Sequence, residues 1–130
     1  MIESHATVPG LVDPTGPFSH VVVGTGASLV SIAGQVSVDA AGELVGAGDA
    51  GAQARRCLEC IDAALRAVGG GPTDVVKGTV FVTDIEDRAA IAEARRAYFG
   101  DHAPAATMVE VSALAVPGCV VEIEATAVLA

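Results

Sequence analysis

The sequence has few basic residues. Lys and Arg number seven among 130 residues, against 16 Asp and Glu, so the formal net charge is −9. Binding to nucleic-acid phosphates requires a surplus of Lys and Arg, and this composition therefore argues against a nucleic-acid partner. The only adjacent basic pairs are Arg55-Arg56 and Arg95-Arg96. Both fall on expected helices, where we expect them to lie on solvated faces.

Long apolar runs are also missing, although 52% of the residues are hydrophobic. A membrane-spanning helix needs about 18 or more consecutive apolar residues. The sequence contains no such run, so we expect no membrane partner. The first residues do not combine a cationic segment with an apolar one, and no secretory signal is expected. A length of 130 residues fits one domain, which we expect to span residues 1–130, and the odd number of cysteines fits a reducing cytoplasm.

Cysteine is scarce as well. The chain has three cysteines, and an odd number argues against a disulfide framework. Cys57 and Cys60 form a CxxC pair, but the pair lies within an expected helix and no second ligand pair accompanies it. We interpret Cys57 as a small core residue in preference to a zinc or redox residue, and we expect no metal site.

Two segments have the period of an amphipathic helix. Asp49 is a suitable N-cap for a helix that runs to about Val68. A second helix begins in the acidic segment Asp84–Asp87, where carboxylates interact favourably with the positive end of the helix dipole. It runs through Phe99, and Gly100 closes it.

Three segments before residue 84 have the β-branched and aromatic content of strands. They are Ser19–Gly24, Leu29–Val38 and Val75–Thr83. A turn at Thr25–Ser28 joins the first two, so the sequence predicts that they form a hairpin. We expect Met1–Thr7 to add a short edge strand.

The last quarter of the chain contains two more strand patterns, Thr107–Leu114 and Cys119–Val128. Pro117-Gly118 lies between them and favours a turn, so we expect a hairpin-like connection. In the second pattern Glu122 and Glu124 alternate with apolar residues, which puts both carboxylates on one face of the sheet. Either this is a solvated strand face, or one carboxylate points into a cleft and performs acid–base chemistry.

The predicted order of elements is strand, strand, helix, strand, helix, strand, strand. This order is typical of an α+β fold in which two amphipathic helices cover one face of a mixed β-sheet. The other face would remain uncovered, so we expect self-association into a closed symmetric ring.

Five short motifs follow one another along nearly the whole chain. They are Gly16-Pro17-Phe18, Ala33-Gly34-Gln35-Val36, Val80-Phe81-Val82-Thr83-Asp84, Pro104-Ala105 followed by Val109-Glu110-Val111, and Val121-Glu122-Ile123-Glu124-Ala125. In these motifs the chain resembles the RidA/YjgF family (endoribonuclease L-PSP, imine deaminases). The resemblance implies a homotrimer with a chorismate-mutase-like fold and a small-molecule ligand in clefts between subunits, without metal or organic cofactor. The best-known activity of the family is hydrolysis of enamines and imines, such as 2-aminoacrylate, to 2-keto acids and ammonia.

The resemblance also identifies cleft residues, several of which depart from the family pattern. In deaminating members an Arg that grips the substrate carboxylate follows Pro-Ala, and Ala106 stands there in this chain. Phe18 replaces a Tyr, Ala33 a Ser and Met108 a Cys, while Glu86 corresponds to an Asn. The expected site comprises Phe18, Ala33, Gln35, Glu86, Ala106, Thr107, Met108 and Glu122.

Glu122 is the carboxylate that the resemblance assigns to positioning water in the cleft. Neither Ala106 nor Thr107 can replace the two parallel hydrogen bonds of an Arg. We therefore expect a relatively apolar metabolite and little ordinary 2-imino-acid hydrolysis. One hypothesis is an enzyme, hydrolase-like or deaminase-like, with Glu122 as general acid/base. The others are a non-catalytic trimer that binds a small molecule or partner protein, and an ordinary deaminase of 2-aminoacrylate.

Overall fold

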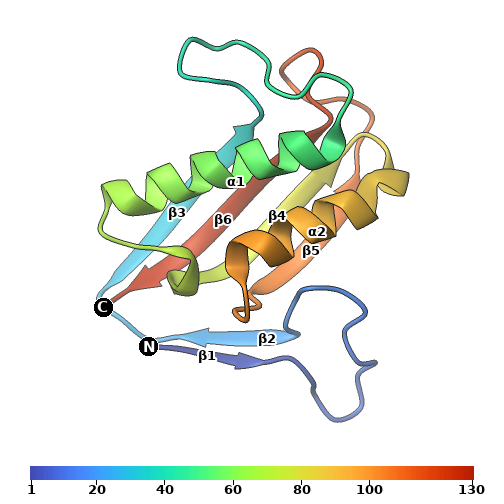
Figure 1. Ribbon diagram of the computed structural model, residues 1–130. Coiled ribbons are helices and arrows are strands. Elements are labelled where there is room, and N and C mark those ends of the chain that lie inside the picture. The colour runs from blue at the N-terminus through green and yellow to red at the C-terminus, as the bar shows by residue number, and fades with distance from the viewer.

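The last strand of the chain is central to the fold. In the computed structural model, which describes residues 1–130, β6 (Val121–Leu129) runs antiparallel to β3 (Ser28–Val36) and to β4 (Val75–Val82). β5 (Ala105–Glu110) is parallel to β4 and forms one edge. The strand order is β3-β6-β4-β5, so the sheet is mixed, as predicted (Figure 1).

Both helices cover the same face of this sheet (Figure 1). α1 (Ala50–Ala67) begins after Asp49, whose carboxylate accepts a hydrogen bond of 3.0 Å from a backbone N–H in the first turn. α2 (Arg88–Phe99) follows the 3-10 turn η2 (Ile85–Asp87) and ends at Gly100, where φ is 60°. The two predicted helices and the α+β class are therefore confirmed.

Alternation along β6 determines where the core lies. Its odd-numbered residues from 121 to 127 are at most 7% exposed and face the helices, whereas Glu122 and Glu124 face the other side. From α1 a stripe of five residues with the predicted spacing packs onto them: Ala54, Cys57, Leu58, Ile61 and Leu65. The core lies between the sheet and the helices, so the opposite face of the sheet has no helix over it.

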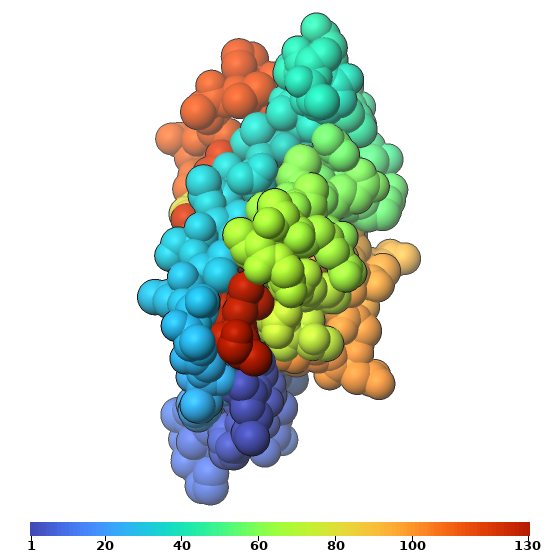
Figure 2. All heavy atoms as spheres, turned by 90° about the vertical axis from the view of Figure 1, so that its left-hand side faces the viewer, coloured from blue at the N-terminus to red at the C-terminus, as the bar shows by residue number.

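The N-terminal strands pair differently from the prediction. β2 (Val21–Gly24) pairs antiparallel with β1 (Ile2–His5) and not with β3, so the predicted β2–β3 hairpin is wrong. The chain passes close to the end of β6 between them, because a Cβ at Gly26 would overlap the carbonyl oxygen of Leu129. Figure 2 shows the C-terminal end of the chain beside β3, directly above the N-terminal hairpin.

The C-terminal strands are also not neighbours. β4 lies between β5 and β6, and the predicted hairpin-like connection is wrong. The turn itself is present, since φ is 83° at Gly118 and the Cys119 N–H donates to the Val116 carbonyl at 3.2 Å. It belongs to a loop that carries the chain past β4.

The remaining element is the 3-10 turn η1 (Pro72–Asp74), which leads from α1 to β4. None of the helices is both long enough and apolar enough to span a bilayer.

Candidate functional site

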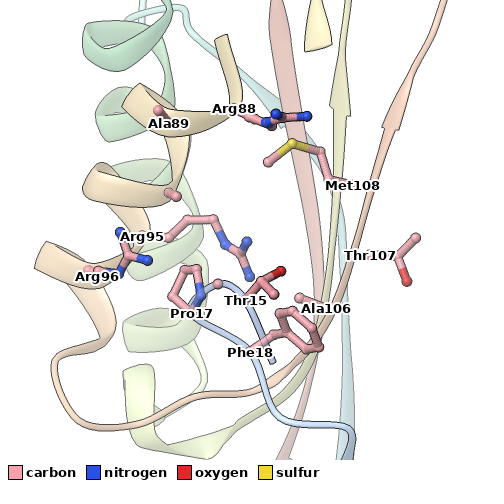
Figure 3. A pocket seen from close by; sticks show the side chains of 12 residues that line it. Thr15, Pro17, Phe18, Arg88, Ala89, Arg95, Arg96, Ala106, Thr107 and Met108 are labelled. Carbon is pink, nitrogen blue, oxygen red and sulfur yellow. The ribbon is translucent and has the colours of Figure 1, made fainter. Parts of the chain in front are cut away.

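A pocket of about 710 Å³ lies between α2, β5 and the loop that precedes β2 (Figure 3). It brings together Phe18, Ala106 and Met108, three of the predicted site residues. Thr107 borders the pocket, but its side chain points to the opposite side of β5 (Figure 3). There its hydroxyl accepts a hydrogen bond of 2.8 Å from Nζ of Lys77. We call the space between α2, β5 and the loop the α2–β5 pocket.

The pairing of β5 with β4 determines which residues face the α2–β5 pocket. Met108 lies beside Val80, which is 1% exposed and packs beneath the helices. Ala106 lies beside Gly78 on the same face. The two predicted site residues therefore point to the helix side because the sheet alternates with a period of two.

Ser19 fixes the loop that carries Phe18. The Ser19 hydroxyl donates to the Ala103 carbonyl at 2.5 Å, and its backbone N–H donates to the Pro104 carbonyl at 3.2 Å. Ser19 is 2% exposed, so these bonds are shielded from water. The loop is thereby held against the start of β5, and the ring of Phe18 reaches the pocket (Figure 3).

The α2–β5 pocket also contains a cluster of positive charge. Arg88, Arg95 and Arg96 line it, and no Asp or Glu does. Arg95 is 6% exposed and forms no hydrogen bond or ion pair within the chain. Burial, and then the neighbouring charge of Arg96, lowers the pKa of the Arg95 guanidinium from its ordinary value.

The sequence interpretation missed this cluster, because it assigned Arg95 to a solvated helix face. That assignment is wrong for Arg95, although Arg96 is exposed. A signal existed in the spacing: Arg95 follows Ile91 by four residues and therefore falls in the apolar stripe of α2. Ile91 and Ala94 in that stripe are buried.

Glu122 lies on the other face of the sheet. It is half-buried between Val36 of β3 and Phe81 of β4, and it forms no ion pair or hydrogen bond through its side chain. Gly34 lies against it, because a Cβ at position 34 would overlap Oε2 and come within 2.8 Å of Cδ of Glu122. Within one chain, Glu122 is therefore not in the same pocket as Ala106.

The other predicted site residues are also separate from the α2–β5 pocket. Gln35 lines a different pocket of about 350 Å³ beside α1, and its Nε2 donates to the carbonyl of the exposed Ala33 at 3.0 Å. Glu86 is exposed in η2, and its backbone N–H donates to the carboxylate of Asp84 at 3.0 Å. One chain does not bring these residues next to Phe18.

The cysteines show no arrangement for metal binding. No three His, Cys, Asp or Glu side chains lie close enough together to hold an ion. Cys57 is fully buried in the core, and burial, with smaller effects from neighbouring groups that include Cys60, raises the pKa of its thiol to about 12. A thiol in this environment is protonated at neutral pH and is a weak nucleophile.

Comparison with known proteins gives a consistent result. Residues 10–129 match the family model described as Endoribonuclease L-PSP. A RutC family protein of Pyrococcus horikoshii is 41% identical over 115 residues, which cover 88% of each chain. The human 2-iminobutanoate/2-iminopropanoate deaminase is 36% identical over 126 residues, which cover 96% of this chain and 87% of the human one.

Solved structures agree with this match. A Rid family protein of Yersinia pestis superposes with a TM-score of 0.86 at 37% identity, covering 96% of this chain and 98% of that one. A putative endoribonuclease of Thermotoga maritima gives a TM-score of 0.74 at 35% identity, with 98% of each chain covered.

Proposed function

Because the chain belongs to the Endoribonuclease L-PSP family, also known as RidA/YjgF, we propose that it hydrolyses a small imine or enamine with Glu122 as the acid–base group. The observation that carries this proposal is the free carboxylate of Glu122, which is half-buried and has no partner in the chain. Such a carboxylate is available to hold a water molecule or a substrate proton. The human relative is named for the deamination of two 2-imino acids, a reaction of the same class.

We propose that the complete site forms between copies of the chain in a homotrimer. Glu122 lies on the open face of the sheet, whereas the α2–β5 pocket lies on the helix side. The open face exposes Leu29 and Val109, which are 73% and 38% accessible, and association would remove this apolar surface from water. A second copy covering this face would bring its own pocket residues towards Glu122.

The chemistry requires one water molecule and one proton carrier, and an enamine must first become an imine by gaining a proton on its β-carbon and losing one from nitrogen. The Glu122 carboxylate takes a proton from water while the water oxygen bonds to the carbon of the C=N group. The carboxyl group then gives the proton to nitrogen, which produces a carbinolamine. Removal of the hydroxyl proton and protonation of the leaving nitrogen release ammonia and leave a ketone. One water is consumed, and Glu122 returns to its starting state.

RNA cleavage is not part of this proposal, despite the description of the family. A chain with a net charge of −9 repels a phosphate backbone. The three arginines lie within one pocket and do not form an extended basic surface.

The decisive experiment compares Glu122→Gln with the wild-type protein. Ammonia release is measured with imines generated in situ, and 2-keto-acid binding is measured by calorimetry. We expect Glu122→Gln to lower turnover about 10²- to 10⁴-fold, the usual range for a lost acid–base group, while the protein still binds the keto acid. Glu124→Gln is the matched control, because Glu124 shares the face but is exposed, and we expect its turnover to be unchanged.

Two outcomes would contradict the proposal. Full turnover by Glu122→Gln would exclude Glu122 as the acid–base group. Keto-acid binding by a wild-type protein that releases no ammonia from any imine would favour the non-catalytic binding trimer.

A further inference from the structure

Arg95 is a buried cation that lacks a partner. It extends from α2 towards the sheet and into the α2–β5 pocket (Figure 3). Only 6% of the residue is exposed, yet no carboxylate or carbonyl of the chain bonds to its guanidinium. No fully buried side-chain nitrogen in the protein lacks a hydrogen bond. The unpaired nitrogens of Arg95 must therefore reach the open space of the pocket.

A purely structural role does not account for this arrangement. A buried guanidinium stabilises a fold only when partners satisfy its charge and its five N–H donors. Arg95 has no such partners, so no interaction within the folded chain offsets the free energy of desolvating its charge. An anion that enters the pocket would supply the missing partner.

The rest of the pocket also favours an anion. Its lining includes three of the seven basic residues and none of the 16 acidic residues of the chain. Arg88 and Arg95 are seven residues apart on α2, which places them on the same helix face about 10 Å apart along the axis. Between them Ala89 and Ala92 line the pocket, and their short side chains leave room for a ligand.

We propose that the α2–β5 pocket is an anion site for a small dicarboxylic acid, with one carboxylate on Arg95 and the second near Arg88. The planar guanidinium matches a carboxylate through two parallel hydrogen bonds. Phe18 and Met108 border the pocket and offer apolar contact to the carbon chain. In this arrangement α2 supplies the guanidinium that position 106 lacks, and Ala106 leaves space for it.

This inference deepens the proposed function, because it gives the substrate of the same site a carboxylate. It rests on the proposed function for the reaction that follows binding, but not for binding itself. We expected a relatively apolar ligand because Ala106 offers no guanidinium. The arginines of α2 change this expectation to an anionic ligand.

The test is a calorimetric titration of the trimeric protein with 2-oxoglutarate, 2-ketobutyrate and 2-butanone. The three probes carry two, one and no carboxylates. We expect 2-oxoglutarate to bind at least tenfold tighter than 2-ketobutyrate, and 2-butanone not to bind. Arg95→Met should weaken both acids about ten- to a hundredfold, the effect of one charge-assisted pair.

Two further variants make the result specific. Arg88→Met should remove the advantage of 2-oxoglutarate while leaving 2-ketobutyrate binding intact. Arg55→Met is the matched control, because it removes one exposed arginine from α1 and should leave both affinities unchanged. Arg95→Lys keeps the positive charge but lacks the planar guanidinium, so it should bind both acids with intermediate affinity. Circular dichroism verifies that each variant is folded.

Unchanged binding by folded Arg95→Met would overturn the anion site. Equal binding of 2-oxoglutarate and 2-ketobutyrate would overturn the dicarboxylate assignment, as would tighter binding of inorganic phosphate than of either acid. These results are independent of ammonia release. Arg95-dependent binding without turnover would contradict the proposed function alone, and turnover without Arg95-dependent binding would contradict this inference alone.

Discussion

Glu122 of β6 and Gly34 of β3 lie in direct contact across the irregular part of the β3–β6 ladder. The carboxylate occupies the space that a side chain at position 34 would need, and a Cβ there would come within 2.8 Å of Cδ of Glu122. The absence of a side chain at Gly34 therefore allows the observed position of the carboxylate.

Gly34→Ala should displace this carboxylate without unfolding the protein. The new methyl group meets only the end of a flexible side chain, which can rotate away at little cost. We expect turnover in the imine assay to fall at least tenfold, while Tm changes by less than about 3 °C. In the control Gly71→Ala the new methyl group meets no atom closer than 3.8 Å, so turnover should be unchanged. Full activity of Gly34→Ala would mean that the position of Glu122 does not matter.

Arg95→Met should stabilise the ligand-free protein. It replaces an unpaired guanidinium in a residue that is only 6% exposed with a shorter, unbranched apolar side chain. We expect a gain of about 1 kcal/mol or more, which corresponds to a rise in Tm of roughly 3–5 °C for a chain of this size. Thermal unfolding without ligand measures the change. Arg55→Met is the control and should have little effect, and a large fall in Tm for Arg95→Met would indicate a structural role.

The sequence predicted the elements of the fold better than their pairing. Composition and periodicity are local properties, so the strand around Val80 could be located from its β-branched and aromatic residues and the strand around Ile123 from the alternation of its own residues. Which strands become neighbours depends on long-range packing, and a turn signal such as Pro117-Gly118 is compatible with a hairpin or with a loop past another strand. The predicted β5–β6 hairpin was wrong for this reason.

The same distinction applies to the candidate site. Family motifs predicted Phe18, Ala106 and Met108, and these residues do share one pocket. Arg95 was missed because charged residues are rarely buried, and this general tendency outweighed its position in the helical stripe. Glu122 and Ala106 lie on opposite faces of the sheet because of the register in which β4, β5 and β6 pair, and no short motif specifies that register.

Cys57 should make the protein less stable in alkaline solution. Burial raises the pKa of its thiol from 9.0 to about 12 in the folded chain. Between these values the unfolded state releases a proton that the folded state retains. The contribution of Cys57 to stability is therefore complete below pH 9 and is lost as the pH rises towards 12, at roughly 1.4 kcal/mol per pH unit.

Urea titrations of the wild type and Cys57→Ala between pH 7 and 11 measure this effect. The variant should be less stable at pH 7, because it loses buried contacts, and the difference should shrink above pH 9. Cys60→Ala alters a half-exposed thiol and serves as the control. Parallel pH profiles for the wild type and Cys57→Ala would contradict the prediction.

The uncovered face of the sheet should mediate a homotrimer. Sedimentation at micromolar concentration should give the mass of three chains of 12.9 kDa each. Val109→Lys places a charge on this face and should shift the protein towards monomer, because burying an unpaired charge is costly. Val68→Lys, at the exposed end of α1, should remain trimeric. A wild-type monomer would contradict the proposed assembly.

The anion site can also be tested by moving its guanidinium from α2 to β5. Ala106→Arg alone would put a second buried cation into the pocket that Arg95 occupies, and like charges in a poorly solvated space repel. We expect this variant to unfold at lower temperature, by roughly 3 °C or more, and to gain no affinity for 2-ketobutyrate.

Combining Ala106→Arg with Arg95→Met keeps the net charge and leaves one buried guanidinium in the pocket. This double variant should regain the stability of the wild type, and its affinity for 2-ketobutyrate should lie within about tenfold of the wild type. Ala106→Arg with Arg55→Met is the matched control, because it has the same net charge but retains both guanidinium groups in the pocket. In thermal unfolding this control should lose as much stability as the single variant. If both double variants instead behave alike, the charges at positions 95 and 106 do not interact, and the two residues do not serve the same site.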